Sequence, residues 1–229
     1  MEEAGVLYTP LAPPLACPRC LRPLEPEKRR WVTCWDCGHE HPPTLPRVSV
    51  ATYGATGTLP WRLYTAAKFE NASPKNVAEY VTAIAAMLSL TIERDYPAFS
   101  DSGGDHVVVP LPSSSGLIVR CLDAVEEHNW PRLNRLEALT AADRPKQTGL
   151  KMDARRDAAA GKYTASDAVA GRHVLLVDDA YTSGYSIHDA ARAVTVSGVL
   201  SVSGVVYARR IYPDAMALYR VETGMDADG

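Results

Sequence analysis

The sequence lacks any long apolar run. None of its stretches approaches the ~18 to 20 uninterrupted apolar residues that a membrane-spanning helix requires. The first residues, Met1-Glu2-Glu3-Ala4, are acidic where a signal peptide is basic, and no apolar segment follows them. We therefore expect a cytoplasmic protein that has no membrane partner.

The sequence also lacks a strong excess of either charge. Its formal net charge is −3, and its hydrophobic fraction of 46% is ordinary for a globular protein. The net charge of the chain therefore does not favour nucleic-acid binding. Basic residues gather only locally, as in Lys28-Arg29-Arg30, and a solvated surface is the simplest interpretation of this run. A chain of 229 residues has room for one α/β domain and a small appendage.

Cysteine is scarce, but four of the five cysteines form two C-x-x-C pairs. Each pair presents two thiolates from one tight turn, and two pairs complete a tetrahedral Zn²⁺ site without a catalytic water. So short a segment cannot bury a stable core unaided, so the metal would supply most of its folding free energy. The predicted ligands are Cys17, Cys20, Cys34 and Cys37.

Other interpretations of the cysteines are weaker. Disulfides are rare in cytoplasmic proteins, and a redox C-x-x-C usually occurs singly beside a βαβ unit. His39 or His41 could replace one cysteine, and Cys121 is most simply a buried core thiol. Trp31 and Trp35 either pack the module or, with the basic run, dock a protein or single-stranded nucleic acid.

The proline-rich segment 41–46 marks the end of the zinc module. We accordingly divide the chain into residues 1–46 and a domain over 47–229, with hood elements at about 47–100 and a core at about 105–210. Apolar periodicity predicts three helices, at 61–70, 75–93 and 117–128, and strands at 107–109 and 132–139.

The second half contains the clearest unit. A buried strand at 173–177, a loop at 178–184, a helix at 185–197 and a strand at 199–208 follow one another. Strands that alternate with helices predict an α/β fold with a parallel sheet. The polar stretch from about 140 to 166 is long for a connection, which suggests a mobile functional loop.

The residues after the buried strand carry the candidate chemistry. Asp178 and Asp179 stand where α/β sheets bind ligands, and vicinal ribose hydroxyls would donate hydrogen bonds to such carboxylates. Thr182-Ser183-Gly184 begin a helix whose amides and dipole favour a phosphate. Diol binding followed by phosphate binding describes a ribose 5-phosphate compound. The alternative is that the two acids cap the helix or bind a metal.

The string from Val174 to Gly184 resembles the phosphoribosyl pyrophosphate (PRPP) motif of type I phosphoribosyltransferases. More narrowly, the chain resembles the ComF family of competence-associated proteins, which also carries an N-terminal four-cysteine module. Tyr53-Gly54, Lys68-Phe69 and the loop from Pro145 to Leu150 are similar to further motifs of that family.

The resemblance implies a phosphoribosyltransferase-like core with a helical hood and Mg²⁺-dependent transfer of a phosphoribosyl group from PRPP to a nitrogenous base. The implied residues fall into four groups. Asp178 and Asp179 hold the diol as the catalytic pair; the phosphate is bound by Ala180, Tyr181, Thr182, Ser183, Gly184, Tyr185 and Ser186; the pyrophosphate loop is Leu111, Pro112, Ser113 and Ser114; and the flexible loop offers Lys146, Gln147 and Lys151.

Two departures from the family pattern leave an alternative open. Serines at 113–115 stand where the family has several arginines, with Arg120 the nearby base, and Tyr185 replaces a small residue. The alternative to an enzyme is a non-catalytic PRPP or nucleotide sensor, or an adaptor in DNA uptake or processing. For contacts to an acceptor base the sequence offers only guesses, namely Lys68, Tyr53 and Arg209.

Overall fold

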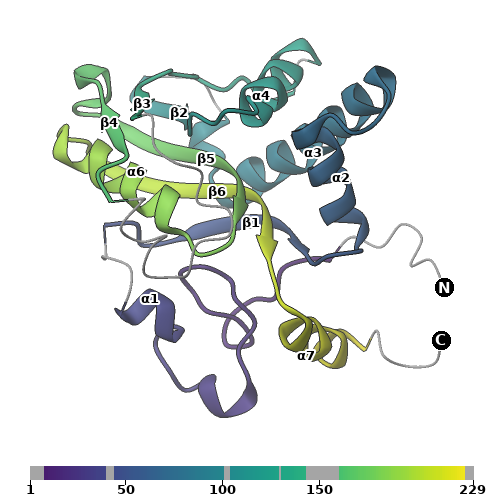
Figure 1. The fold of residues 1–229 in the computed structure, drawn as a ribbon. Coiled ribbons are helices and arrows are strands. Elements are labelled where there is room, and N and C mark those ends of the chain that lie inside the picture. Colours follow the sequence, from purple (N-terminus) through teal and green to yellow (C-terminus); the bar gives the residue numbers. More distant parts are fainter. Residues whose placement is uncertain (1–7, 40–43, 101–103, 129, 143–159, 225–229) are drawn as a thin grey trace.

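The protein is built on a four-stranded parallel sheet with helices on both faces (Figure 1). The structure, a computed structural model, describes residues 8–39, 44–100, 104–128, 130–142 and 160–224. The strand order is β1-β6-β5-β2, formed by β1 (Val48–Gly54), β2 (His106–Pro110), β5 (His173–Tyr181) and β6 (Ser201–Arg210). The expected α/β fold with a parallel sheet is confirmed.

The strands are almost continuously apolar because both faces of the sheet are covered. Residues 107–109 and 174–177 have no exposed surface. One face is covered by a group of three helices, α2 (Leu59–Phe69), α3 (Pro74–Asp95) and α4 (Leu117–Glu127). The other face carries α6 (Tyr185–Val196) together with the cysteine module, so the module belongs to the main hydrophobic core.

Smaller elements complete the fold. The hairpin of β3 (Leu139–Ala141) and β4 (Tyr163–Ala165) is antiparallel and forms a separate two-stranded sheet. The remaining helices are α1 (Trp35–His39), α7 (Pro213–Thr223), and the 3-10 turns Pro26–Lys28, Pro97–Phe99 and Asp167–Val169.

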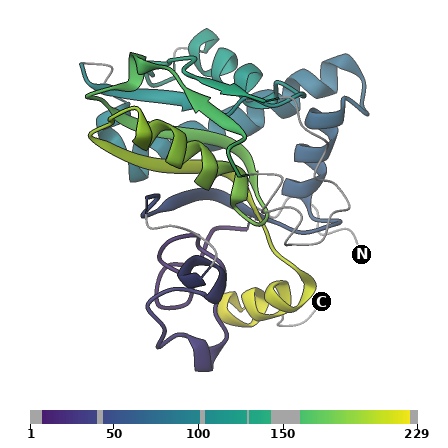
Figure 2. The ribbon, with the colours of Figure 1, turned by 60° about the vertical axis from the view of Figure 1, so that its left-hand side comes forward.

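The cysteine module is docked on the sheet and on α7, as Figure 2 shows. The amide of Val48 in β1 donates a 2.7 Å hydrogen bond to the carbonyl of Arg19, which lies between the first two cysteines. Arg29 forms an ion pair with Glu222 of α7, and the Tyr219 ring packs edge-on against Tyr53 at 5.3 Å. The proposed domain boundary at residue 46 stays a prediction. Leu45, next to this boundary, is fully buried.

The prediction of a strand at 132–139 is wrong. This segment instead lies along the outer edge of β2, where Val108 exchanges hydrogen bonds with Asn134 and Leu136 at 2.8 and 2.9 Å. Its pairing with β2 is a single isolated bridge, from Val108 to Arg135, and its last residue, Leu139, already begins β3. The Arg135 guanidinium forms ion pairs with Asp123 and Glu137.

Two further boundaries differ from the sequence prediction. Strand β5 does not end at 177 but continues to Tyr181, so the two acidic residues lie within the strand rather than in a loop. Strand β1, inside the segment assigned to the hood, pairs with β6 in the main sheet. Helix α7 was not expected, since its apolar residues are not gathered on one face at helical spacing.

Within the described residues, no helix is long and apolar enough to cross a membrane.

Gly204 allows α6 to approach the sheet closely. A Cβ at this position would lie 2.9 Å from Cδ1 of Ile187 in α6 and 3.3 Å from Cγ2 of Val48 in β1. A larger residue at this position of β6 must therefore displace the end of the Ile187 side chain, and a bulkier one the helix that carries it.

We expect Gly204→Val to lower the free energy of unfolding by about 1 to 3 kcal/mol, because overpacking forces strained rotamers or a helix shift. Urea unfolding followed by circular dichroism measures the change. Gly204→Ala, which adds one carbon, should lose less. Equal midpoints for all three proteins would contradict the close packing.

Candidate functional site

A cavity of about 330 Å³ opens at the carboxyl end of β5. Open parallel sheets place their ligands at this edge. Its walls come from β5, the start of α6, α2, the end of β6, and the turn after β2. The lining residues are Tyr64, Lys68, Pro112, Ser113, Lys162, Tyr163, Asp178, Asp179, Ala180, Tyr181, Thr182, Ser183, Gly184, Tyr185, Ser186, Ile187 and Arg210.

Asp179 is held from α2. Its Oδ2 lies 2.7 Å from Nζ of Lys68, and its Oδ1 accepts a 3.4 Å hydrogen bond from the hydroxyl of Tyr64. Lys68 also donates to the Tyr64 hydroxyl at 2.7 Å. Burial opposes the charge on Lys68, but Asp179 raises its pKa above the ordinary value. The side chain of Asp179 is therefore fixed in position by two residues of α2.

Asp178 has no cationic partner at hydrogen-bond distance among the described residues. Its Oδ1 accepts a 2.8 Å hydrogen bond from the amide of Asp179, and its side chain is partly exposed to the cavity. Burial, followed by the charge of Asp179, raises the pKa of Asp178 to about 7. A carboxyl group that is costly to ionise is a natural partner for a cation or for hydroxyl donors.

The turn from Thr182 to Gly184 leads directly into α6. Gly184 has φ +85, and a Cβ there would lie 2.2 Å from the hydroxyl oxygen of Tyr181. Only glycine, which has no Cβ, can adopt this positive φ so close to the Tyr181 ring. The turn thereby brings the first amides of α6, beside the Ser186 side chain, to the cavity wall, where an anion is favoured.

The turn after β2 contributes less than expected. Pro112 and Ser113 line the cavity, whereas Leu111 is 2% exposed and belongs to the core, and Ser114 is not among the lining residues. Arg120 points elsewhere. It forms an ion pair with Glu70 at 3.1 Å and donates to the carbonyl of Ala67 at 2.9 Å.

The long connection between β3 and β4 returns to the site through Lys162 and Tyr163. Asp189 of α6 anchors this return, because its two carboxylate oxygens accept hydrogen bonds from the amides of Gly161 and Tyr163 at 2.8 and 2.9 Å. Nζ of Lys162 lies 4.8 Å from the centre of the Tyr163 ring. The expected flexible-loop residues Lys146, Gln147 and Lys151 lie outside the described residues.

Five lining residues were not among the predicted site residues, namely Tyr64, Lys162, Tyr163, Ile187 and Arg210. Tyr64 precedes Lys68 by four residues, which is the helical spacing that brings two side chains together. Arg210 ends the strand beside β5, and it stacks on Trp61 at 5.3 Å. Of the guesses for base contacts, Lys68 lines the cavity, whereas Tyr53 and Arg209 are buried and are not among its lining residues.

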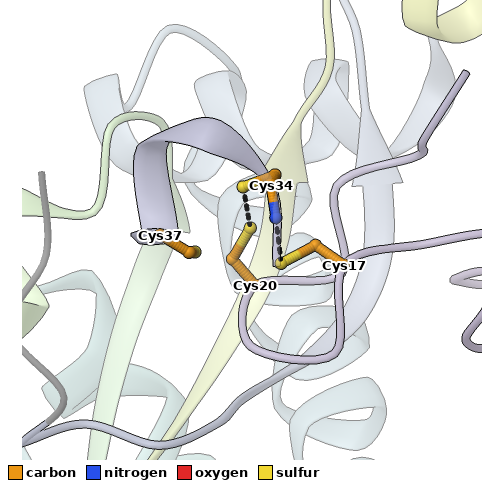
Figure 3. Close-up of side chains that lie close together, drawn as sticks. All are labelled: Cys17, Cys20, Cys34 and Cys37. Carbon is orange, nitrogen blue, oxygen red and sulfur yellow. Dashed lines mark hydrogen bonds between the residues drawn. The ribbon is translucent and has the colours of Figure 1, made fainter. Parts of the chain in front are cut away.

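The four paired cysteines converge as predicted (Figure 3). Their sulfurs lie within 4.8 Å of one another, and those of Cys20 and Cys34 are 3.7 Å apart. A tetrahedral zinc ion with Zn–S distances of about 2.3 Å has sulfur–sulfur edges of about 3.8 Å. The Cys34 amide donates to the sulfur of Cys17 at 3.3 Å, as amides do to metal-bound thiolates. The arrangement could hold a zinc ion in a closed structural site.

Side chains near the cysteines support this assignment. Arg19 donates hydrogen bonds to the carbonyls of Cys37 and Leu45, which ties the two C-x-x-C turns to the core. His39 is exposed and its Nδ1 contacts the carbonyl of Trp35, so it is not one of the clustered groups. Trp31 and Trp35 remain 42% and 50% exposed, and Cys121 is buried between helices as expected.

The zinc assignment predicts a zinc-to-protein ratio of about one in protein purified without chelator, measured by inductively coupled plasma mass spectrometry. Cys34→Ser should lose the metal and several degrees of melting temperature, because the metal no longer links the two C-x-x-C turns. Cys121→Ala is the matched control and should retain the metal. A metal-free wild-type protein that melts normally would contradict the site.

The raised pKa of Asp178 predicts how stability depends on pH. Its folded-state pKa of about 7 lies above its ordinary value, so this group's stabilising contribution is present at low pH and is lost as pH rises toward 7. Asp178→Asn should raise the free energy of unfolding at pH 8 by about 1 to 2 kcal/mol. Urea unfolding at pH 5 and pH 8 measures this. A variant that is less stable at both values would contradict the buried charge.

The chain is 28% identical to the competence protein ComFC of Bacillus subtilis (strain 168) over 132 residues. The match covers 53% of this chain and 49% of ComFC, so the chain spans about half of the length of this curated relative. No family model matches the chain.

The fold also resembles solved structures. A hypoxanthine-guanine phosphoribosyl transferase of L. donovani is 19% identical, with 56% of this chain and 71% of that chain covered and a TM-score of 0.38. A hypoxanthine phosphoribosyltransferase of Trypanosoma cruzi is 14% identical, with 59% and 79% covered and a TM-score of 0.40. The ComFC match agrees with the motifs, and the chain is similar to the ComF family of phosphoribosyltransferase-like proteins.

Proposed function

We propose that the chain binds PRPP, or a closely related ribose 5-phosphate compound, with Mg²⁺ in the cavity at the end of β5. One observation carries the proposal: the Asp178-Asp179 pair and the amino end of α6 line the same cavity. Carboxylates suited to a diol therefore face the same space as amides suited to a phosphate.

The ribose hydroxyls are assigned to the two carboxylates. Asp179, held by Lys68, is an acceptor whose position is fixed before the ligand arrives. Asp178 is partly exposed to the cavity and gains most from a donor or a cation, because its own ionisation is opposed by burial and by Asp179. Mg²⁺ bound to the ligand would supply such a charge.

The 5-phosphate is assigned to the turn over 182–184 and to the first turn of α6. Thr182, Ser183 and Ser186 offer hydroxyl donors, and the helix dipole adds partial positive charge. Tyr185, at the position where a small residue was expected, is 7% exposed and lines the cavity wall.

The cations that contact the pyrophosphate of PRPP would differ from those of the family pattern. Among the described lining residues the cations are Lys68, Lys162 and Arg210. Ser113 faces the same space from the turn after β2. Magnesium and these side chains together would offset the pyrophosphate charge.

Transfer follows if an acceptor nitrogen reaches C1 of the bound ribose. The nitrogen forms a bond to C1 as the C1–O bond to pyrophosphate breaks; pyrophosphate keeps the electron pair, and the acceptor nitrogen releases its proton. Positioning and charge stabilisation supply the catalysis in this scheme. The activity proposed is that of a phosphoribosyltransferase acting on a nitrogenous base.

A second function is favoured by one specific observation. Arg120, the base nearest to the turn after β2, is engaged by Glu70 and by the Ala67 carbonyl and does not line the cavity. A chain that binds PRPP without transferring it would act as a sensor or as an adaptor in DNA uptake or processing. The competence role named for ComFC agrees with this alternative.

Two further features belong to the proposal. A protein or single-stranded nucleic acid would bind the exposed face of the cysteine module at Trp31 and Trp35. A cytoplasmic location is proposed because thiolates persist as zinc ligands in a reducing compartment.

Isothermal titration calorimetry with Mg-PRPP tests the binding. We expect binding by the wild-type chain and a loss of at least tenfold in affinity for Asp178→Asn and for Asp179→Asn, since each removes a charged acceptor. Asp167→Asn, at an exposed carboxylate outside the cavity, is the matched control and should bind as the wild type does.

Release of pyrophosphate across a panel of purine and pyrimidine bases then separates the two functions. Turnover that is lost in both aspartate variants supports the transferase, and binding without turnover supports the sensor or adaptor. If wild-type protein loaded with zinc binds neither PRPP nor ribose 5-phosphate, the proposed function is wrong.

A further inference from the structure

Asp189 in α6 is a buried carboxylate that holds the residues on either side of Lys162. Its exposed fraction is 7%. Its Oδ1 accepts a 2.8 Å hydrogen bond from the amide of Gly161, and its Oδ2 accepts a 2.9 Å hydrogen bond from the amide of Tyr163. Amides two residues apart in an extended chain point in the same direction, so one carboxylate can hold both. We call this contact the Asp189 clamp.

The clamp is secured from two further directions. Arg192, also in α6, donates from Nε to Oδ1 of Asp189 at 2.9 Å and from Nη2 to the carbonyl of Tyr163 at 3.3 Å. On the other edge of the chain, the carbonyl of Lys162 accepts a 2.9 Å hydrogen bond from the amide of Ala142, next to the end of β3. The backbone of Lys162 is therefore held by α6 on one side and by the β3–β4 hairpin on the other.

The charge of Lys162 is available to a ligand. Lys68, by contrast, is paired with Asp179 at 2.7 Å. Among the described residues no carboxylate forms an ion pair with Lys162, whose Nζ lies 4.8 Å from the centre of the Tyr163 ring at the cavity wall. Burial and the charge of Asp179 raise the pKa of Asp178, and Lys162 is one of two cations that oppose this rise. Its charge thus acts on the part of the cavity that contains the carboxylates.

Lys162 enters the cavity from the side of β2. The β3–β4 hairpin continues the segment that bonds to Val108 of β2, and the amide of Ser166 donates to the carbonyl of Ala138 in that segment at 2.9 Å. Ser113, in the turn after β2, lines the same cavity. The proposed function gives this side of the cavity to pyrophosphate and the amino end of α6 to the 5-phosphate.

We propose that Asp189 is a positioning residue that fixes Lys162 at the pyrophosphate end of the cavity, so that the chain selects PRPP over ribose 5-phosphate. The inference rests on the proposed function and narrows its ligand, because the two compounds share the diol and the 5-phosphate and differ in the group at C1. A lysine ammonium forms charge-assisted hydrogen bonds with phosphate oxygens. A backbone that is held beforehand lowers the entropy lost when the ligand binds.

Isothermal titration calorimetry with Mg-PRPP and, separately, with ribose 5-phosphate and Mg²⁺ tests the selection. Lys162→Met should lower the affinity for PRPP about tenfold and leave the affinity for ribose 5-phosphate within about twofold, because only the pyrophosphate loses a partner. Lys162→Arg keeps the charge and should recover most of the PRPP affinity. An equal loss for both ligands, or no loss for either, would overturn the assignment of Lys162.

Asp189→Asn tests the positioning role. The asparagine side chain cannot accept hydrogen bonds from both backbone amides, so the affinity for PRPP should fall about fivefold with little change for ribose 5-phosphate. In the Lys162→Met background the same substitution should add less than about twofold, because the lysine that it positions is already gone. A merely structural role of Asp189 would weaken the binding of both ligands in both backgrounds, and that result would contradict the proposal.

Two further variants keep the test decisive. Ser197→Ala is the matched control, because it removes another contact between α6 and β4, the 3.4 Å hydrogen bond from the Ser197 hydroxyl to the carbonyl of Ala165. It should leave the ratio of the two affinities unchanged. If Asp189→Asn does not fold, Arg192→Met weakens the clamp through a side chain that is 45% exposed. PRPP affinity alone should then fall about twofold, and an unchanged ratio would count against the clamp.

Failure of the proposed function gives a different result. A wild type that binds both PRPP and ribose 5-phosphate, with a ratio that no variant changes, refutes only the roles of Asp189 and Lys162. A wild type that binds neither compound refutes the proposed function. Titration with Mg-pyrophosphate then decides the role of Lys162: binding that is weakened in Lys162→Met supports an anion site, and absence of binding refutes it.

Discussion

The parallel pairing of β5 with β6 is the constraint on which the candidate sites depend. It places Tyr181 beside Arg209 and brings the ends of both strands to one edge of the sheet. From that edge the chain turns at Gly184 into α6, whose close packing requires the bare backbone of Gly204. The cavity and the turn both depend on this one pair of strands.

Charge is concentrated at this edge at a cost in stability. Asp178 and Asp179 are adjacent carboxyl groups, and Lys68 neutralises only one of them closely. Arg209 is buried behind the turn, and among the described residues its Nε has no hydrogen-bond partner. Unpaired buried charges are unfavourable in an empty protein and become favourable when a ligand or metal completes them. The arrangement is typical of a binding site.

The sequence predicted the parts of this arrangement that are local. The apolar run at 173–177, the glycine at 184 and the spacing of the cysteines each report on their nearest neighbours along the chain, so the strand, the turn and the cluster were foreseen. Helices α2, α3 and α4 were foreseen for the same reason. The prediction of a strand at 132–139 was wrong because most of this segment contacts β2 through only a few hydrogen bonds.

By itself, the sequence determined which chemistry is present: two carboxylates before a helix start and four thiols at zinc-binding spacing. Tertiary structure alone decided which of these groups meet. Lys68 reaches Asp179 across 111 residues, Arg120 turns away to Glu70, and Arg209 donates hydrogen bonds to the carbonyls of Tyr181 and Thr182. The physical reason is that such contacts depend on the pairing order of strands and on helix packing, and neither leaves a periodic signal in the neighbouring residues.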